Sequence, residues 1–266
     1  MGIGKRSHGL SETDRPAAKA PEAALPRRGV RVETRELTRR FGPHLALDRV
    51  TLTIQPGESF GLLGANGAGK TTFIRLVAGF LLPSEGSVTV DGISPAALPA
   101  QVQARIGFVT ETSRLYPELR VRGFLRFVGG ARGLAGPALS AAVERVLERF
   151  RLEAVVSRLV GNLSKGFQQR VSLAQAFLHQ PPLVIVDEPT EGLDPVQKGE
   201  VREMLRGLRG ERTVILCTHD LEEAQSLASQ VAVLSEGRLA AVGPSDEVLG
   251  RADALDLFRR GAGSPA

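Results

Sequence analysis

The chain has 266 residues, of which 42% are apolar and 24% charged, a composition typical of a folded globular protein and not of a disordered or collagen-like one. Apolar runs such as Leu76 to Leu82 stop at seven residues, far below the roughly 18 that a membrane-spanning helix requires. The single cysteine, Cys217, excludes an intramolecular disulfide, and one tyrosine with no tryptophan disfavours a surface for stacking nucleic-acid bases. We therefore expect a protein that neither spans a membrane nor binds nucleic acid.

The positive charge is concentrated near the N-terminus. The formal net charge is +5, and seven basic and three acidic side chains in residues 1–31 account for +4 of it. Because this segment is rich in alanine and proline and lacks aromatic residues, we predict a disordered tail over residues 1–30. The alternative is a weak contact with an anionic membrane, worth about 1 kcal/mol per basic residue.

From residue 31 to about 245, short apolar segments alternate with helical patterns. This alternation predicts an α/β domain with a largely parallel sheet. Buried strands are expected at residues 60–63, 183–186, 214–217 and 231–234, and a smaller antiparallel sheet is expected from residues 32–37, 50–54 and 88–90. Apolar residues at helical spacing predict an inserted helical subdomain over about 113–180. Residues 246–266 are expected to form a short helix and tail.

A glycine-rich loop follows the first of the buried strands. Residues 64–71 read Gly-Ala-Asn-Gly-Ala-Gly-Lys-Thr, which matches the phosphate-binding loop pattern and opens a helical segment, as that motif requires. The glycines let backbone N–H groups turn toward one anion, which the positive end of the helix also attracts. Lys70 is placed to bridge the β- and γ-phosphates of a nucleotide, and the Thr71 hydroxyl to bind Mg²⁺.

A second buried strand ends in two carboxylates, Asp187 and Glu188. Open α/β sheets bind their ligands at the carboxyl ends of the strands, and two acids at that edge require a cation. A strand that ends in two solvated acids is common by itself. Together with the phosphate loop, however, it predicts that Asp187 holds Mg²⁺ and that Glu188 polarises an attacking water.

Between these two motifs, residues 163–170 read Leu-Ser-Lys-Gly-Phe-Gln-Gln-Arg, and Ser164 is placed to cap the following helix. The order of motifs resembles the ATP-binding cassette (ABC) family: a phosphate loop, a helical insertion, a Leu-Ser-x-Gly-x-Gln signature and an acid-ended strand. The resemblance covers about residues 31–245. It implies a P-loop NTPase core with a largely parallel sheet, a small antiparallel β subdomain and an inserted helical subdomain.

The resemblance also gives roles to three residues that have plainer readings. Phe41 becomes the aromatic that stacks on adenine, Asp194 the D-loop acid, and His219 the switch histidine that faces the γ-phosphate. Otherwise Phe41 would be a core aromatic, Asp194 a helix cap before Pro195, and His219 a loop residue. The implied catalytic residues are thus Glu188, His219 and Lys70, and Mg²⁺ would be bound by Thr71, Asp187 and Glu111. The implied ATP-binding residues are Phe41, Gly64, Asn66, Gly67, Ala68, Gly69, Lys70, Thr71, Thr72, Glu111, Ser164, Gly166 and Asp194.

Two positions depart from the family pattern. Glu111 stands where most cassettes have glutamine, and a carboxylate can bind Mg²⁺ but cannot donate a hydrogen bond to water. Lys165 and Phe167 replace the glycine and glutamine of the signature; Lys165 either brings a positive charge near phosphate or points into solvent. Both departures, with residues 115–119 after the loop, look like the type-2 ABC exporter subfamily, which includes ATPases linked to gliding motility and drug export.

The resemblance implies an ATPase that powers transport by a separate permease at the cytoplasmic face of the membrane. One copy of each motif implies a dimer, homodimeric by expectation, in which Ser164 and Gly166 of one chain close over ATP bound to the other. The permease would dock on residues 111–122 and the neighbouring helices, and the short segment after Gly243 favours export. Two alternatives are a soluble cassette ATPase that acts on DNA or ribosomes, and a regulatory nucleotide-binding module without turnover.

Overall fold

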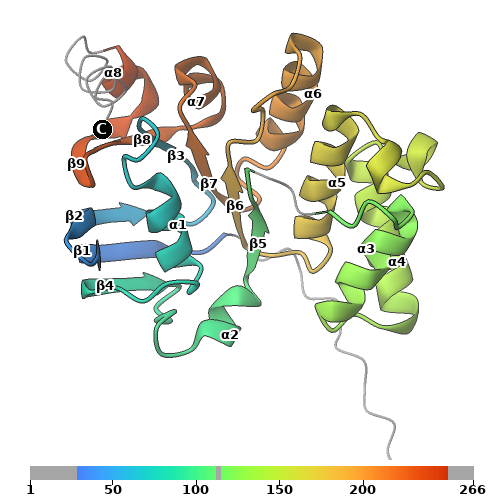
Figure 1. Ribbon diagram of the computed structural model, residues 1–266, viewed down its shortest axis with the longest axis horizontal. Helices are drawn as coiled ribbons and strands as arrows, with labels where there is room; N and C mark the ends of the chain where they lie inside the picture. Colours follow the sequence, from blue (N-terminus) through green and yellow to red (C-terminus); the bar gives the residue numbers. More distant parts are fainter. Residues whose placement is uncertain (1–28, 112–114, 251–266) are drawn as a thin grey trace, which may run out of the picture.

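The computed structural model describes residues 29–111 and 115–250 (Figure 1). Its largest element is a six-stranded sheet in the order β5-β6-β7-β3-β8-β9, in which only β9 runs antiparallel to its neighbour. The strands are β3 (Ser59–Leu63), β5 (Ile106–Val109), β6 (Leu183–Asp187), β7 (Thr213–Thr218), β8 (Gln230–Ser235) and β9 (Arg238–Pro244). Every residue of β3, β6 and β7 is buried, which is why these segments are mostly apolar, with polar residues only at their ends. The four buried strands predicted from the sequence lie within β3, β6, β7 and β8.

A three-stranded antiparallel sheet in the order β2-β1-β4 stands beside the large sheet (Figure 1). Its strands are β1 (Val32–Phe41), β2 (His44–Ile54) and β4 (Glu85–Val90). The predicted 32–37 strand was too short, because β1 continues past an irregularity. Glu36 has φ +48° and the pairing register shifts between Thr34 and Leu37, so the apolar alternation breaks although the strand does not. As a result, β1 carries the chain four residues further, to Phe41.

Helices cover the large sheet and join it to the small one. They are α1 (Lys70–Val77), α2 (Pro99–Gln103), α6 (Pro195–Arg206), α7 (Leu221–Leu227) and α8 (Ser245–Leu249). Helix α1 presents Phe73, Ile74 and Leu76, all fully buried, to a core that also holds residues of both sheets. Because α1 starts at Lys70, this packing fixes the phosphate loop against the end of β3.

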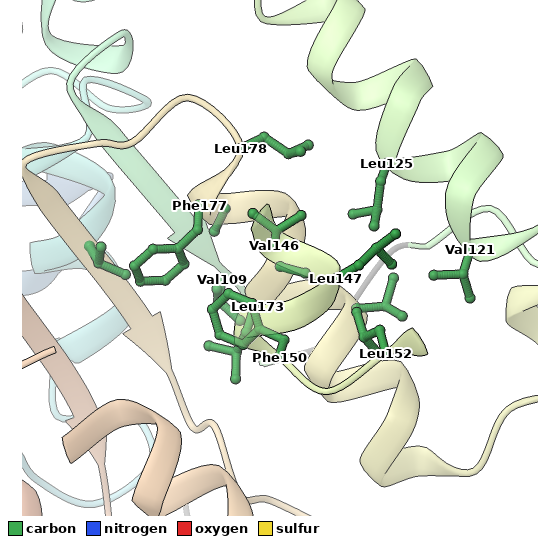
Figure 2. Packing of buried hydrophobic residues seen from close by; sticks show 14 of the residues in the cluster. Val109, Val121, Leu125, Val146, Leu147, Phe150, Leu152, Leu173, Phe177 and Leu178 are labelled. Atoms are coloured by element: carbon green, nitrogen blue, oxygen red, sulfur yellow. The ribbon is translucent and has the colours of Figure 1, made fainter. Parts of the chain in front are cut away.

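The segment between β5 and β6 is helical, as predicted. It contains α3 (Val121–Ala131), α4 (Gly136–Arg149), α5 (Lys165–Phe177) and two 3₁₀ turns, Glu153–Val155 and Val160–Asn162. Figure 2 shows its core, where the rings of Phe150 and Phe177 lie with centroids 5.2 Å apart beside Leu173. Val109 and Val184 of the sheet belong to the same cluster, so the helical region and the sheet share one core.

Val30, the last residue of the segment predicted to be a tail, is packed in the fold. The Val30 amide donates to the Oγ1 atom of Thr213 at 2.9 Å, and that hydroxyl donates back to the Val30 carbonyl at 2.7 Å. Val30 is buried, so the packed region starts before residue 31. The rest of the predicted tail, and the C-terminal segment after Gly250, lie outside the described residues. None of the helices in the described ranges is long and apolar enough to cross a membrane.

Candidate nucleotide-binding site

The loop between β3 and α1 curls around the side chain of Lys70. Gly69 has φ +106°, and a Cβ there would lie 2.6 Å from the Ala46 carbonyl oxygen, so only glycine fits. Lys70 is 6% exposed, and its Nζ donates to the carbonyls of Gly64 at 2.6 Å and Ala65 at 3.3 Å. A buried cation therefore sits inside a loop whose following helix begins at the same residue, which is an arrangement suited to phosphate.

The two acids that end β6 have different surroundings. Asp187 is 5% exposed, and burial, then the charges of Glu188 and Glu111, raise its pKa to about 6. Glu188 follows with φ +46°, an uncommon conformation for a residue with a side chain, and its amide donates to the Cys217 carbonyl at 2.9 Å. This turn directs Glu188 away from the strand and toward Lys70, whose Nζ lies 3.6 Å from Glu188 Oε1.

His219 contacts the other oxygen of Glu188. It follows β7, the neighbour of β6, and its Nδ1 lies 3.0 Å from Glu188 Oε2. Its Nε2 lies 3.7 Å from Glu191 Oε2, so the imidazole stands between two carboxylates. Glu188 Oε1 is buried and accepts no hydrogen bond from any of the described residues, although it is within ion-pair distance of Lys70. The plainer reading of His219 as a loop residue omitted this contact.

These groups open onto one cavity of about 410 Å³. Its lining residues are Phe41, His44, Ala46, Ala65, Asn66, Gly67, Gly69, Lys70, Thr71, Thr72, Glu111, Asp187 and Glu188. Ten of them were predicted from the sequence as site residues, and Ala65 lies in the predicted phosphate loop. Phe41 is 43% exposed, so the reading of it as a core aromatic was wrong. His44 and Ala46 were missed, because only the turn from β1 into β2 brings them here.

Comparison with known proteins decides the family. Residues 47–191, more than half of the chain, match the family model described as ABC transporter. The chain belongs to the ABC transporter family. It is 39% identical over 197 residues to the ABC transporter ATP-binding protein NatA of Bacillus subtilis (73% of this chain, 80% of the relative). It is 36% identical over 219 residues to the Nod factor export ATP-binding protein I of Cupriavidus metallidurans (82% and 72%). The predicted family and its ATPase activity are confirmed.

Solved structures of ABC proteins share the fold. An ATP-binding subunit of an ABC transporter has a TM-score of 0.75 at 31% identity, covering 86% of this chain and 98% of that one. A dimeric ATP-binding cassette in a post-hydrolysis state with ADP and Pi has a TM-score of 0.72 at 26% identity, covering 80% and 98%. The predicted fold class, an α/β P-loop core with a helical insertion, is therefore confirmed.

The residues predicted to form the ABC signature and the D-loop lie apart from the cavity around Lys70. Ser164 caps α5 by accepting from the Phe167 amide at 3.4 Å, as predicted, and Asp194 caps α6 by accepting from the Gln197 amide at 2.9 Å. Neither these two residues nor Gly166 is among the described residues that line the cavity. A Cβ on Gly166 would lie 2.7 Å from the Gln197 side chain, so the two motifs pack against each other.

A second cavity, of about 530 Å³, adjoins the first between the sheet and the helical region. It shares Thr71, Glu111 and Asp187 with the first cavity. Its other wall is aromatic: the rings of Tyr116 and Phe124 have centroids 6.2 Å apart, and Tyr116 is 45% exposed. The sequence predicted that residues 111–122 contact a permease, but it did not predict the cavity beside them.

The residues at the junction of the two cavities suit a divalent cation. The Thr71 hydroxyl and the carboxylates of Asp187 and Glu111 are oxygen donors, which Mg²⁺ prefers. Burial is the largest cause of the raised pKa of Asp187, and the charges of Glu188 and Glu111 raise it more than Lys70 and Arg75 lower it, so the carboxylates leave an excess of negative charge here. A cation bound there would remove that excess.

Proposed function

We propose that the chain is the ATP-hydrolysing subunit of an ABC exporter whose permease is a separate chain. The observation that carries this proposal is the contact of Lys70, Glu188 and His219 at the mouth of the phosphate loop. A lysine that binds phosphate and a carboxylate that orients water are groups that catalyse phosphoryl transfer to water, and the histidine holds the carboxylate in place.

In the proposed reaction, ATP places its phosphates in the loop and its base against Phe41. The Lys70 ammonium then leaves the carbonyls of Gly64 and Ala65 for the β- and γ-phosphates. Glu188 Oε1 loses its ion-pair partner by this move and becomes free to accept a hydrogen bond from the attacking water, while His219 keeps Oε2 in place. Mg²⁺, held by Thr71, Asp187 and Glu111, would supply charge neutralisation at the phosphates.

The site is completed, in this proposal, by a second copy of the chain. Ser164, Gly166 and Asp194 lie outside the cavity of their own chain, and the related cassette with ADP and Pi is dimeric. Ser164 and the Gly166 backbone at the start of α5 would meet the γ-phosphate bound by the partner chain, and the exposed Asp194 at the start of α6 would lie at the interface between the two copies. Lys165 is exposed and lies beside Gly192, its Nζ 3.4 Å from where a Cβ on that glycine would stand.

Mixing two inactive variants tests the composite site. Ser164→Glu brings a negative charge toward the γ-phosphate, and Lys70→Ala removes the phosphate-binding ammonium, so each homodimer is expected to be inactive. A heterodimer of the two variants has one intact site and should recover ATP hydrolysis, measured as phosphate release. Absence of activity in a heterodimer proven by two affinity tags would contradict independent composite sites.

The permease is proposed to dock at the second cavity, with Glu111 and the aromatic wall around Tyr116 as its contacts. The export direction is supported by a relative named for export, the Nod factor export ATP-binding protein I. A probable multidrug ABC transporter ATP-binding protein of Escherichia coli is also 34% identical over 222 residues, which are 82% of this chain and 38% of that one. Such a subunit should be recovered with the cell membrane, at its cytoplasmic face, only when its permease is co-expressed. Recovery with ribosomes or DNA instead would contradict the proposal.

A further inference from the structure

Arg39 lies against the ring of Phe41, a contact that the sequence did not reveal. The guanidinium carbon is 4.5 Å from the ring centroid, within the range of a cation–π interaction. The two residues are two apart on β1, so their side chains leave the same face of the strand. Phe41 lines the nucleotide cavity, whereas Arg39 is not among the described residues that do so. The ring therefore has a cation beside it that takes no direct part in lining the cavity.

Arg39 is also tied to the segment that leaves the phosphate-loop helix. Its Nη1 donates to the Leu82 carbonyl at 2.8 Å. The amides of Phe80 and Leu81, just before Leu82, both donate to the Arg75 carbonyl in the last turn of α1. Through these bonds, one side chain connects the ring at the end of β1 with the helix whose N-terminus forms the phosphate site.

We infer that Arg39 is a positioning residue for the nucleotide base. This inference rests on the proposed stacking of Phe41 on adenine. Arg39 holds the ring in one orientation before the nucleotide arrives, so less side-chain entropy is lost when the base stacks. It also sets the distance between the Phe41 ring and the phosphate loop, because its hydrogen-bond partner Leu82 follows α1, the helix that begins at that loop. The expected contribution is about two- to fivefold in ATP affinity, the scale of a partly exposed cation–π contact.

The neighbouring Arg40 gives a matched control. It is exposed, and its Nε lies 4.0 Å from Glu85 Oε1, so Arg40→Met removes the same charge one residue away without touching the ring. Calorimetry should compare ATP with tripolyphosphate, which has phosphates but no base. We expect Arg39→Met to raise the Kd for ATP about two- to fivefold and to leave the Kd for tripolyphosphate unchanged. Arg40→Met should change neither, and in turnover Arg39→Met should raise KM and leave kcat unchanged.

Two results would overturn the inference. Equal ATP affinity of the wild type and Arg39→Met would show that the contact is without effect on binding. An equal loss for ATP and tripolyphosphate would show that Arg39 acts on the phosphates through its charge. If Arg39→Met fails to fold, Arg39→Lys, which keeps the cation, takes its place and is expected to show a smaller loss confined to ATP.

Phe41→Leu separates this inference from the proposed function. When that variant binds ATP more weakly than the wild type and a further Arg39→Met adds nothing, Arg39 acts through the ring, as inferred. When Phe41→Leu weakens ATP but Arg39→Met does not, only the role of Arg39 is wrong. When Phe41→Leu binds ATP like the wild type, the stacking role of Phe41 fails and the inference fails with it.

Discussion

Asp187 is expected to destabilise the protein when no Mg²⁺ is bound, and Asp187→Asn should reveal by how much. The Asp187 carboxyl has no hydrogen-bond partner among the described residues. It is buried and lies near the carboxylates of Glu188 and Glu111. Its pKa is raised from 3.8 to about 6. At 1.36 kcal/mol per pKa unit, the ionised carboxylate costs the folded state about 3 kcal/mol relative to the neutral acid.

The sign of the pH dependence of stability follows from the number of protons that the folded and the unfolded state bind. Below pH 3.8 the carboxyl is protonated in both the folded and the unfolded state, so it costs nothing. Between pH 3.8 and about 6 only the unfolded state ionises, so the free energy of unfolding falls as the pH rises. Above about pH 6 the full cost is present. Asparagine imitates the neutral acid, and Asp187→Asn should therefore be more stable than the wild type at pH 8 and close to it near pH 4.

Urea denaturation in EDTA at pH 8 and pH 4 measures this difference, with Glu118→Gln, an exposed carboxylate in a turn, as the control for net charge. We expect Asp187→Asn to gain up to about 3 kcal/mol at pH 8 and the control to change by under about 0.5 kcal/mol. Saturating Mg²⁺ should reduce the gain, since it stabilises only the wild type strongly. A wild type as stable as Asp187→Asn at pH 8 in EDTA would refute the reasoning.

Three further changes test other parts of the account. Lys70→Ala removes the buried ammonium of the phosphate loop but no core side chain, so phosphate release should fall below about a tenth of the wild-type rate while the circular dichroism spectrum is kept. Deleting residues 1–28 leaves the Val30–Thr213 hydrogen bonds intact and should barely change Tm or ATPase rate; a large loss of Tm would show that the tail packs on the fold. Phe150→Ala empties a site that is 1% exposed in the shared core and should cost about 3–5 kcal/mol in urea unfolding, and a loss under about 1 kcal/mol would contradict the packing described.

The sequence predicted the parts of the fold that are strongly patterned. Continuous apolar segments marked the strands that are buried on both faces, and the phosphate loop located the site between β3 and α1. Two strands of the large sheet, β5 and β9, were missed. β5 is apolar but has only four residues, one of them glycine, so it is too short to be distinguished from its surroundings. β9 is half-exposed along most of its length and lacks a continuous apolar segment.

Site residues that lie within one short sequence motif were predictable. Residues that only the folded chain brings to the site were not. Lys70, Asp187 and Glu188 belong to short motifs whose residue types and spacing indicate phosphate and cation binding. His44 and Ala46 reach the cavity only because β1 runs on past its irregularity and turns back into β2. Ordinary strand residues of this kind carry no signal in one sequence.

The central claim, hydrolysis by water held at Glu188, is tested most directly by turnover of Glu188→Gln. Glutamine keeps the size of the side chain but cannot polarise water, so phosphate release should slow by about two or more orders of magnitude while ATP binding survives. Size-exclusion chromatography with ATP should then show a trapped dimer of the 28.3 kDa chain, since hydrolysis normally separates the two copies. Asp187→Asn should show weaker Mg²⁺ binding and no trapped dimer. Near wild-type turnover of Glu188→Gln would contradict the account and make Glu111 the next carboxylate to test.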